Sequence, residues 1–180
     1  MNIVVIGFKS AGKSTVGACL AEQIGYSFDD LDRRLSEKAS LELGKSVDFR
    51  EAFRLLGEAR FRELESSLLR EAMAEDGLVL SLGGGAPLDQ AAPGLVEGHC
   101  VVYIRAPEED LVRRTRAGGW PAYLEGEPDP ESALRRLLRE RIPRYEAMAD
   151  VVIDNPDDDP PSRSAEAGAR QVQEWMKARR

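Results

Sequence analysis

The sequence predicts an α/β domain built around a parallel sheet. Short apolar runs alternate with segments whose apolar residues recur at helical spacing, as the strands and crossover helices of such a sheet require. The first apolar run, residues 3–6, leads directly into a glycine-rich pattern typical of phosphate-binding loops, residues 7–14. A length of 180 residues suits one domain with a substantial core. We therefore expect a single P-loop domain over residues 1–180.

The predicted elements follow one another in a regular order. Apolar runs predict strands at residues 3–6, 26–29, 78–82, 100–104 and 151–153. Apolar residues at helical spacing predict helices at residues 14–24, 57–77, 107–116, 131–148 and 165–177. Gly25 is a fitting end for the first helix, and Pro107 with the acids after it a fitting start for a later one. Pro143 must bend its helix or mark an irregular end.

Two segments interrupt this order. Residues 33–60 look helical, but they lie between a strand and the helix expected to follow it, and we interpret them as an insertion. Residues 116–130 contain six glycines and prolines, which leave no room for a regular element. A loop of this composition is a candidate lid over a binding site.

Composition limits the classes of function. The formal net charge of −7 argues against nucleic acid as a partner, because phosphate backbones are held by clustered lysine and arginine. No apolar tract is long enough for a membrane span, and no signal sequence follows Met1, so we expect a soluble, cytoplasmic, monomeric protein that acts on small molecules. Cys19 and Cys100 lack metal-ligand spacing, and His99 is the only histidine, which leaves little for a histidine-based site.

The glycine-rich pattern carries the first chemical prediction. Gly7 and Gly12 let the backbone wrap an anion, and a helix starting near Lys13 points its positive end at the phosphates of a nucleoside triphosphate. Lys13 would reach the β- and γ-phosphates, and Ser14 would bind Mg²⁺. A plain glycine-rich turn is the alternative, but such a turn needs no Lys-Ser at its end.

Three further groups lie near the expected phosphate edge of the sheet. Residues 29–32 supply three carboxylates, of which one can orient Mg²⁺ while another meets an acceptor hydroxyl, although a solvated acidic turn is an equal alternative. Gly83, Gly84 and Gly85 follow a strand and let backbone amides approach a ligand. Arg62 and Arg141, each by itself a common surface residue, could together clamp a carboxylate.

The combination of these motifs resembles the shikimate kinase family over nearly the whole chain. The matching positions are Gly7 to Thr15, Asp30 and Asp32, Phe61-Arg62 with Glu65, Leu82 to Gly85, Arg113-Arg114-Thr115, and Arg141 with Pro143 and Tyr145. The resemblance implies a three-layer P-loop fold of the nucleoside-monophosphate-kinase type. It has five parallel strands flanked by helices, a helical substrate-binding insertion (about 33–60) and a lid (about 116–130).

The resemblance also implies an activity and a set of roles. The expected reaction transfers the γ-phosphoryl group of ATP, with Mg²⁺, to the 3-hydroxyl of shikimate in aromatic amino-acid synthesis. Carried over by position, the catalytic residues are Lys13, Asp32 and Arg141, and the metal-binding residues are Ser14 and Asp30. The nucleotide-binding residues are Gly7, Ala11, Gly12, Lys13, Ser14, Thr15, Arg114 and Pro160. The shikimate-binding residues are Asp32, Arg62, Gly83, Gly84, Gly85 and Arg141.

Two positions depart from the family pattern. Ser10 stands where the family's P-loop usually has glycine, and Trp120-Pro121 stands where its lid has an arginine before the proline. Arg116 is the nearest substitute for that arginine; alternatively, Trp120 closes over a different acceptor. A related kinase for another small hydroxy acid, or a nucleotide-binding sensor with weak turnover, therefore stays open. A GTPase is not expected, since the chain has neither Asn-Lys-x-Asp nor Asp-x-x-Gly.

Overall fold

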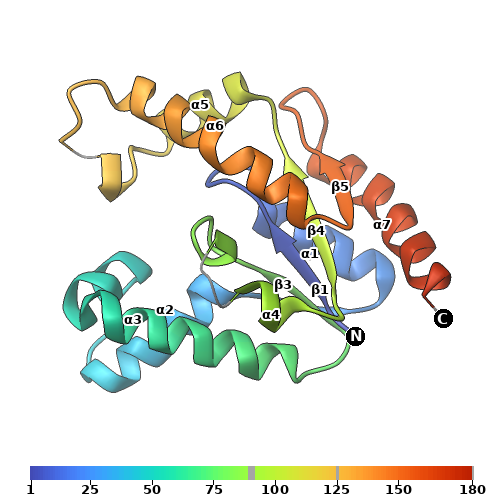
Figure 1. Ribbon diagram of the computed structural model, residues 1–180, viewed down its shortest axis with the longest axis horizontal. Coiled ribbons are helices and arrows are strands. Elements are labelled where there is room, and N and C mark those ends of the chain that lie inside the picture. Colours follow the sequence, from blue (N-terminus) through green and yellow to red (C-terminus); the bar gives the residue numbers. More distant parts are fainter. Residues whose placement is uncertain (89–91, 125, 180) are drawn as a thin grey trace.

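The computed structural model describes residues 1–88, 92–124 and 126–179. Within them five parallel strands form one sheet in the order β2-β3-β1-β4-β5. The strands are β1 (Ile3–Ile6), β2 (Ser27–Asp30), β3 (Leu78–Ser81), β4 (Cys100–Arg105) and β5 (Val151–Asp154). The α-helices are α1 (Lys13–Ile24), α2 (Leu31–Leu43), α3 (Phe49–Met73), α4 (Ala92–Val96), α5 (Glu108–Ala117), α6 (Pro130–Met148) and α7 (Pro161–Ala178). Helices cover both faces of the sheet (Figure 1), which confirms the three-layer P-loop fold.

The central strands are buried because both faces of the sheet are covered. Every residue of β1 and β3 is buried, and so are the first five of β4, as expected for parallel strands between two helical layers. On one face α1 and α7 pack against each other, and α6 lies over the other (Figure 1). The carboxyl ends of β1, β2 and β3 meet at one edge, so the loops that follow these strands are neighbours there.

Element boundaries differ from the expected ones by a few residues. β2 begins at Ser27 rather than at residue 26, and α7 begins at Pro161 rather than at 165, since a proline is well suited to the first position of a helix. The helix predicted to start after Gly57 is continuous with residues before it, but Gly57 itself (φ 74°, ψ 163°) breaks the helical geometry. Pro143 lies inside α6, which continues to Met148.

The two interrupting segments have defined conformations in the described residues. Most of α2 and the first part of α3 fill residues 33–60, and they pack against each other at one end of the molecule (Figure 1). The predicted lid includes the last two residues of α5 and the first of α6, and the described residues between these helices form one 3₁₀ turn, η2 (Ala122–Leu124), which follows the buried Pro121. The short helix α4 and the 3₁₀ turn η1 (Ala86–Leu88) were not predicted. None of the described helices has the length and apolar character needed to cross a membrane.

Candidate active site

The loop between β1 and α1 has the backbone geometry of an anion cradle, and two glycines make it possible. Gly7 has φ 148°, and a Cβ there would lie 2.7 Å from the carbonyl oxygen of Ile104. Gly12 has φ 91°, and a Cβ there would lie 2.4 Å from Nδ2 of Asn155. That amide donates a hydrogen bond of 2.9 Å to the carbonyl oxygen of Ala11 and so stabilises the loop. Only glycine fits at either position.

The P-loop tolerates serine at position 10, where the family usually has glycine, because Ser10 adopts a left-handed backbone conformation. Among the described residues it is the one non-glycine with positive φ, at 66°. This is the left-handed region that glycine enters without penalty and that other residues enter at a cost of about 1–2 kcal/mol. Ser10 therefore keeps the conformation expected for glycine at this position, at some cost in stability.

Lys13 and Ser14 lie at the start of α1, beside Asp30 at the end of β2. Ser14 Oγ donates a hydrogen bond of 2.7 Å to Oδ2 of Asp30. Lys13 Nζ donates one of 3.0 Å to the carbonyl oxygen of Phe8. Burial lowers the pKa of Lys13, while the negative charges of Asp32 and Asp30 oppose that shift. The ammonium group of Lys13 thus lies close to two oxygen donors, the hydroxyl of Ser14 and the carboxylate of Asp30.

The three carboxylates of residues 29–32 have different surroundings. Asp29 is buried between Arg33 and Arg34, with its Oδ2 2.6 Å from Nε of Arg34, and these hydrogen bonds hold its pKa below the usual value despite burial. Asp30 caps α2, because its side chain accepts a hydrogen bond of 3.0 Å from the backbone N–H of Asp32. Asp29 and Asp30 therefore fix the start of α2 and with it the place of Asp32.

Asp32 is the carboxylate best suited to chemistry. Its Oδ1 is buried and finds no hydrogen-bond partner among the described residues. Burial and the nearby charges of Asp30 and Glu65 raise its pKa to about 6, although Lys13 opposes the shift. A Cβ on Gly83 would lie 2.5 Å from Oδ1, so the glycine lets the second loop approach this carboxylate. A buried carboxyl with a raised pKa and a free oxygen is a functional-site candidate.

The glycine-rich loop after β3 joins the P-loop to α6. A Cβ on Gly84 would lie 3.3 Å from the backbone nitrogen of Lys9, which places the two loops side by side. The hydroxyl of Tyr145 on α6 donates a hydrogen bond of 2.5 Å to the carbonyl oxygen of Gly84. Arg141, one turn earlier on α6, lies 5.7 Å from the ring centroid of Phe8. Arg141 is therefore part of the same cluster.

Arg62 approaches the cluster from α3. Its Nη1 lies 2.6 Å from Oε2 of Glu65, a carboxylate that is buried and whose charge acts on Asp32. Its guanidinium carbon lies 5.7 Å from the centroid of Phe61. A paired and stacked arginine has a fixed orientation and still has N–H groups free for a second carboxylate.

Arg114 and Pro160 lie at the opposite end of the P-loop. Arg114 donates a hydrogen bond of 2.9 Å to the carbonyl oxygen of Asn155, pairs with Asp157, and approaches the carbonyl oxygen of Ser10 at 3.4 Å. Pro160 is the exposed N-cap residue of α7 and ends the same β5–α7 loop. Arg114, from α5, is thus tied both to the P-loop backbone and to the β5–α7 loop that ends at Pro160.

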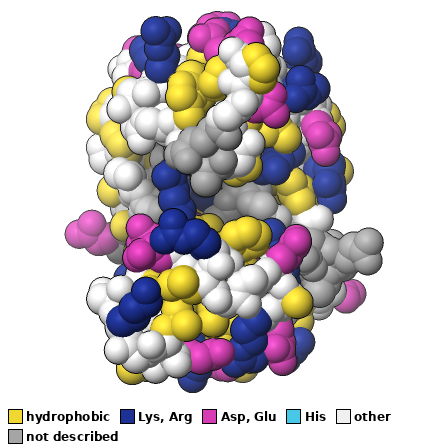
Figure 2. Space-filling model, turned by 90° about the vertical axis from the view of Figure 1, so that its left-hand side faces the viewer, with side chains coloured by type: hydrophobic (Ala, Val, Ile, Leu, Met, Phe, Trp, Pro, Cys, Tyr) yellow, Lys and Arg dark blue, Asp and Glu magenta, His cyan; other side chains and the backbone are white. Residues whose placement is uncertain are grey.

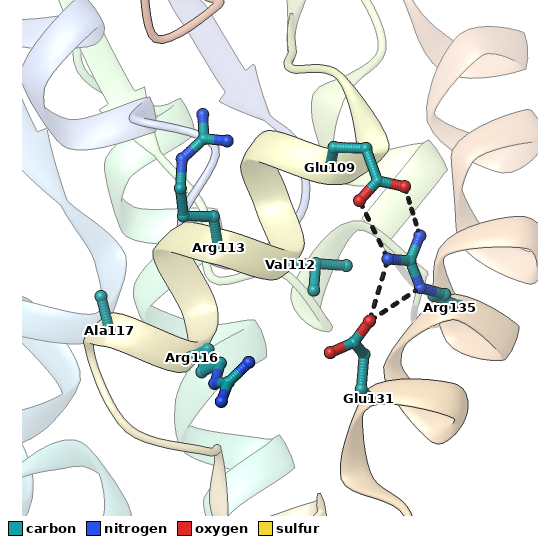
Figure 3. Close-up of a pocket in the computed structure, with 7 residues that line it drawn as sticks. All are labelled: Glu109, Val112, Arg113, Arg116, Ala117, Glu131 and Arg135. Carbon is teal, nitrogen blue, oxygen red and sulfur yellow. Dashed lines mark hydrogen bonds and ion pairs between the residues drawn. The ribbon is translucent and has the colours of Figure 1, made fainter.

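Arg116 does not join the cluster. It lines a surface groove of about 620 Å³ between α5 and α6, together with Val112, Glu131 and Arg135 (Figure 3). Arg135 pairs with Glu109 and Glu131 there, and no predicted site residue lines this groove. Arg113 leaves α5 on a different side from Arg116 (Figure 3). The geometry therefore gives no support to Arg116 as a substitute for a lid arginine.

One side of the molecule is hollowed. Figure 2 shows a hollow between the upper and lower halves, with lysine and arginine side chains at its edge. Tyr123, in the predicted lid, is 50% exposed, and Phe53 and Leu55 of α3 are 40% and 44% exposed. Trp120 packs against the hydrophobic core instead. Large apolar side chains thus remain accessible on both the predicted lid and the predicted insertion.

Sequence reasoning missed several residues that shape the site. Asn155 supports the P-loop, Phe8 and Tyr123 stack on Arg141, and Arg33 and Arg34 fix Asp29. Asn155, Phe8 and Tyr123 act on partners distant in the chain, which no local pattern indicates, whereas Arg33 and Arg34 pair with Asp29 only four and five residues away. One signal was readable, since Asn155 follows the last strand at the edge of the sheet where ligands bind.

Ser14 and Asp30 form a possible site for Mg²⁺. No group of three or more His, Cys, Asp or Glu side chains suited to a metal occurs in the described part of the chain. The hydroxyl of Ser14 and the carboxylate of Asp30 are hard oxygen donors beside the phosphate loop, as Mg²⁺ prefers. Because Mg²⁺ usually keeps several waters and binds phosphate oxygens, two protein oxygens are sufficient for it.

The fold and the cluster define a P-loop protein of the nucleoside-monophosphate-kinase type. Comparison with known proteins then identifies the family. The shikimate kinase family model matches residues 9–177. A shikimate kinase of Pseudomonas paraeruginosa is 36% identical over 162 residues, covering 89% of this chain and 90% of its own, and one of Thermobifida fusca is 35% identical over 169 residues, covering 94% and 93%.

Solved structures agree with the family match. A shikimate kinase from Acinetobacter baumannii in complex with shikimate superposes with a TM-score of 0.76 at 30% identity, covering 99% of this chain and 94% of its own. The chain belongs to the shikimate kinase family, which confirms the resemblance.

Proposed function

We propose that this protein transfers the γ-phosphoryl group of ATP to the 3-hydroxyl of shikimate. The observation that carries the proposal is Asp32, whose Oδ1 is buried, has no hydrogen-bond partner among the described residues, and lies near both Lys13 of the phosphate loop and Gly83 of the glycine loop. A protein that only bound a nucleotide would have no need of such a group facing an acceptor. Membership of the shikimate kinase family and the likeness to a shikimate complex support this acceptor.

The nucleotide would lie along the P-loop. Backbone N–H groups between Gly7 and Thr15 and the amino end of α1 favour the negative charge of its phosphates. Arg114 and Pro160 would contact the adenine at one end of the loop, and Lys13 would neutralise charge on the γ-phosphoryl group at the other. Ser14 and Asp30 would hold Mg²⁺, which would supply positive charge to offset the negative charge that develops on the phosphates.

The acceptor would lie between Asp32 and the two arginines. Asp32 accepts the hydrogen bond of the reacting hydroxyl. It takes the proton of this hydroxyl while the new bond from oxygen to the γ-phosphorus forms and the bond from that phosphorus to the leaving ADP breaks. Arg62 and Arg141 bind the carboxylate of shikimate through charge-assisted hydrogen bonds. Gly83, Gly84 and Gly85 let the acceptor approach the backbone. Catalysis would rest on positioning and charge neutralisation, as is general for phosphoryl transfer.

The test is release of ADP from MgATP by the purified protein, with and without shikimate, together with phosphorus NMR of the product. We expect shikimate-dependent ADP release and a phosphomonoester on the ring. Lys13→Ala should abolish turnover, and Lys38→Ala, an exposed lysine of α2, is the matched control. Nucleotide binding with no effect of shikimate on ADP release would refute the proposal.

A further inference from the structure

Arg141 lies close to two aromatic rings from different parts of the fold. Its guanidinium carbon lies 5.7 Å from the centroid of Phe8 and 5.8 Å from that of Tyr123. Phe8 follows β1 and is buried, with 1% of its surface exposed, whereas Tyr123 belongs to η2 and is 50% exposed. One ring is therefore fixed by the core and the other is contributed by the predicted lid.

Stacking on rings decides how an arginine can meet a carboxylate. A ring face attracts the guanidinium plane, with a free energy of about 0.5–1 kcal/mol at exposed sites and more in dry ones. The N–H groups lie in that plane and point outward from its edge, and a carboxylate binds there through two parallel hydrogen bonds. A ring over Arg141 consequently favours the orientation in which its edge is presented to an acceptor.

Tyr123 also lies where two parts of the molecule approach each other. Burial raises the pKa of its phenol, while the positive charges of Arg141 on α6 and Arg50 on α3 oppose the rise. Both arginines are thus close enough to act on the phenol electrostatically. The turn η2, which carries Tyr123, packs against α6, the helix that carries Arg141.

We propose that Tyr123 is a positioning residue for the acceptor carboxylate, acting by holding the guanidinium of Arg141 edge-on to it. The inference rests on the proposed function and adds a specificity determinant to the same site. It predicts that an aromatic side chain at position 123 favours acceptors with a carboxylate over neutral analogues of the same ring. Tyr123 itself needs no contact with the reacting hydroxyl.

The experiment compares Tyr123→Leu and Tyr123→Phe in steady-state kinetics with ATP and shikimate. Losing one ring contact of about 0.5–1 kcal/mol corresponds to a rise of about 2- to 5-fold in KM for shikimate. We expect this rise in Tyr123→Leu with kcat and KM for ATP changed by less than 2-fold. Tyr123→Phe, which keeps the ring, should restore the lower KM. Leu41→Ala, which truncates an 80% exposed side chain on α2, is the control for surface truncation.

Two further measurements separate orientation from simple contact. The methyl ester of shikimate lacks the negative charge, so Tyr123→Leu should affect the acid much more than the ester. In a double-mutant cycle with Arg141→Lys, which has no planar fork, Tyr123→Leu should add little to the loss already present. Equal effects on acid and ester, or additive effects in the cycle, would overturn the inference.

The outcomes for the two proposals can be told apart. A wild-type protein with shikimate-dependent ADP release, combined with an unchanged KM in Tyr123→Leu, refutes the role of Tyr123 and leaves the function standing. A wild-type protein that shows no such release refutes both.

Discussion

Asp29 and Asp32 show how one short segment gives two carboxylates opposite properties. Asp29 accepts hydrogen bonds from Arg33 and Arg34, which lower its pKa, whereas burial raises the pKa of Asp32 to about 6. The difference follows from neighbours placed by the first turn of α2 and by the loop at Gly83. At the scale of single residues, the fold therefore places the carboxylate of Asp32, whose negative charge is unfavourable there, at the position where the reaction needs a base.

The first prediction concerns the pH dependence of turnover and stability. Because Asp32 must lose its proton to act as base, kcat/KM should rise with pH through an acid limb of apparent pKa near 6. Its pKa in the folded protein exceeds the ordinary value of 3.8, so its charge destabilises the fold increasingly as pH rises from about 4 to 6. Asp32→Asn should abolish turnover yet raise the free energy of unfolding at pH 7.5 by about 2–3 kcal/mol.

Urea unfolding at pH 4.5 and pH 7.5 provides the measurement. The gain of Asp32→Asn over wild type should be small at the lower pH and large at the higher one. Asp29→Asn is the matched control, since a lowered pKa means stability that is present at neutral pH and lost in acid, and this variant should be less stable than wild type at pH 7.5. Loss of stability in both variants would contradict the assignment of Asp32.

At the scale of elements, the packing of α7 on β5 depends on one glycine. A Cβ on Gly168 would lie 2.0 Å from Cδ1 and 2.7 Å from Cγ1 of Ile153, which is buried. Gly168 therefore lets the helix approach the sheet, although glycine lowers helix propensity by about 1 kcal/mol relative to alanine. At this position the close packing of α7 on β5 outweighs the low helix propensity of glycine.

The second prediction is that Gly168→Ala destabilises the protein. Overpacking a core contact costs typically 1–3 kcal/mol, which exceeds the gain in propensity, so the melting temperature should fall by several degrees. Gly94→Ala on α4, where a Cβ meets no atom of the described residues within 4 Å, should leave the melting temperature unchanged or slightly higher. Ile153→Val removes the nearest atom and should recover part of the loss in the double variant. Calorimetry that gave Gly168→Ala the higher melting temperature would disprove this account.

The sequence predicted the elements well wherever the signal was local. The four-residue run before Gly7 identified β1, and the glycines at 7 and 12 identified the phosphate loop, because both depend on neighbours in the chain. Helix ends were less accurate; α7 starts four residues before the predicted position because Pro160-Pro161 can open a helix as well as break one.

The supporting contacts of the site could not be predicted in the same way. Asn155 and Tyr145 each contact a loop that is distant in the chain, so their roles depend on the sheet order rather than on a local pattern. Tyr123 appeared only as part of a segment without regular structure. The family resemblance supplied positions for Arg62, Glu65 and Arg141, but the ion pair of Arg62 with Glu65 and the contact of Arg141 with Phe8 required the structure.

At the scale of the whole molecule, we propose that the predicted lid closes over the site when ligands bind. Exposed apolar side chains on both the predicted lid and α3 would be removed from water if the two approached over bound ligands, which favours closure. Closure would also exclude water from the γ-phosphoryl group and so prevent its hydrolysis. The two tryptophans of the chain can report this motion separately, since Trp120 lies in the predicted lid and Trp175 in α7.

The third prediction uses each tryptophan by itself. In Trp175→Phe, the remaining Trp120 should change its emission when a non-hydrolysable ATP analogue, Mg²⁺ and shikimate are added together, and less with either ligand alone. In Trp120→Phe, the remaining Trp175, packed against Arg179 at 4.2 Å, should change little. Both ligands should also raise the melting temperature of each variant, because ligands that bind only the folded state stabilise it.

Equal responses from the two tryptophans, or an unresponsive Trp120 in a protein stabilised by both ligands, would show that segment 116–130 does not act as a lid. The Trp120–Pro121 pair would then have to be understood as a fixed apolar anchor of that segment on the core.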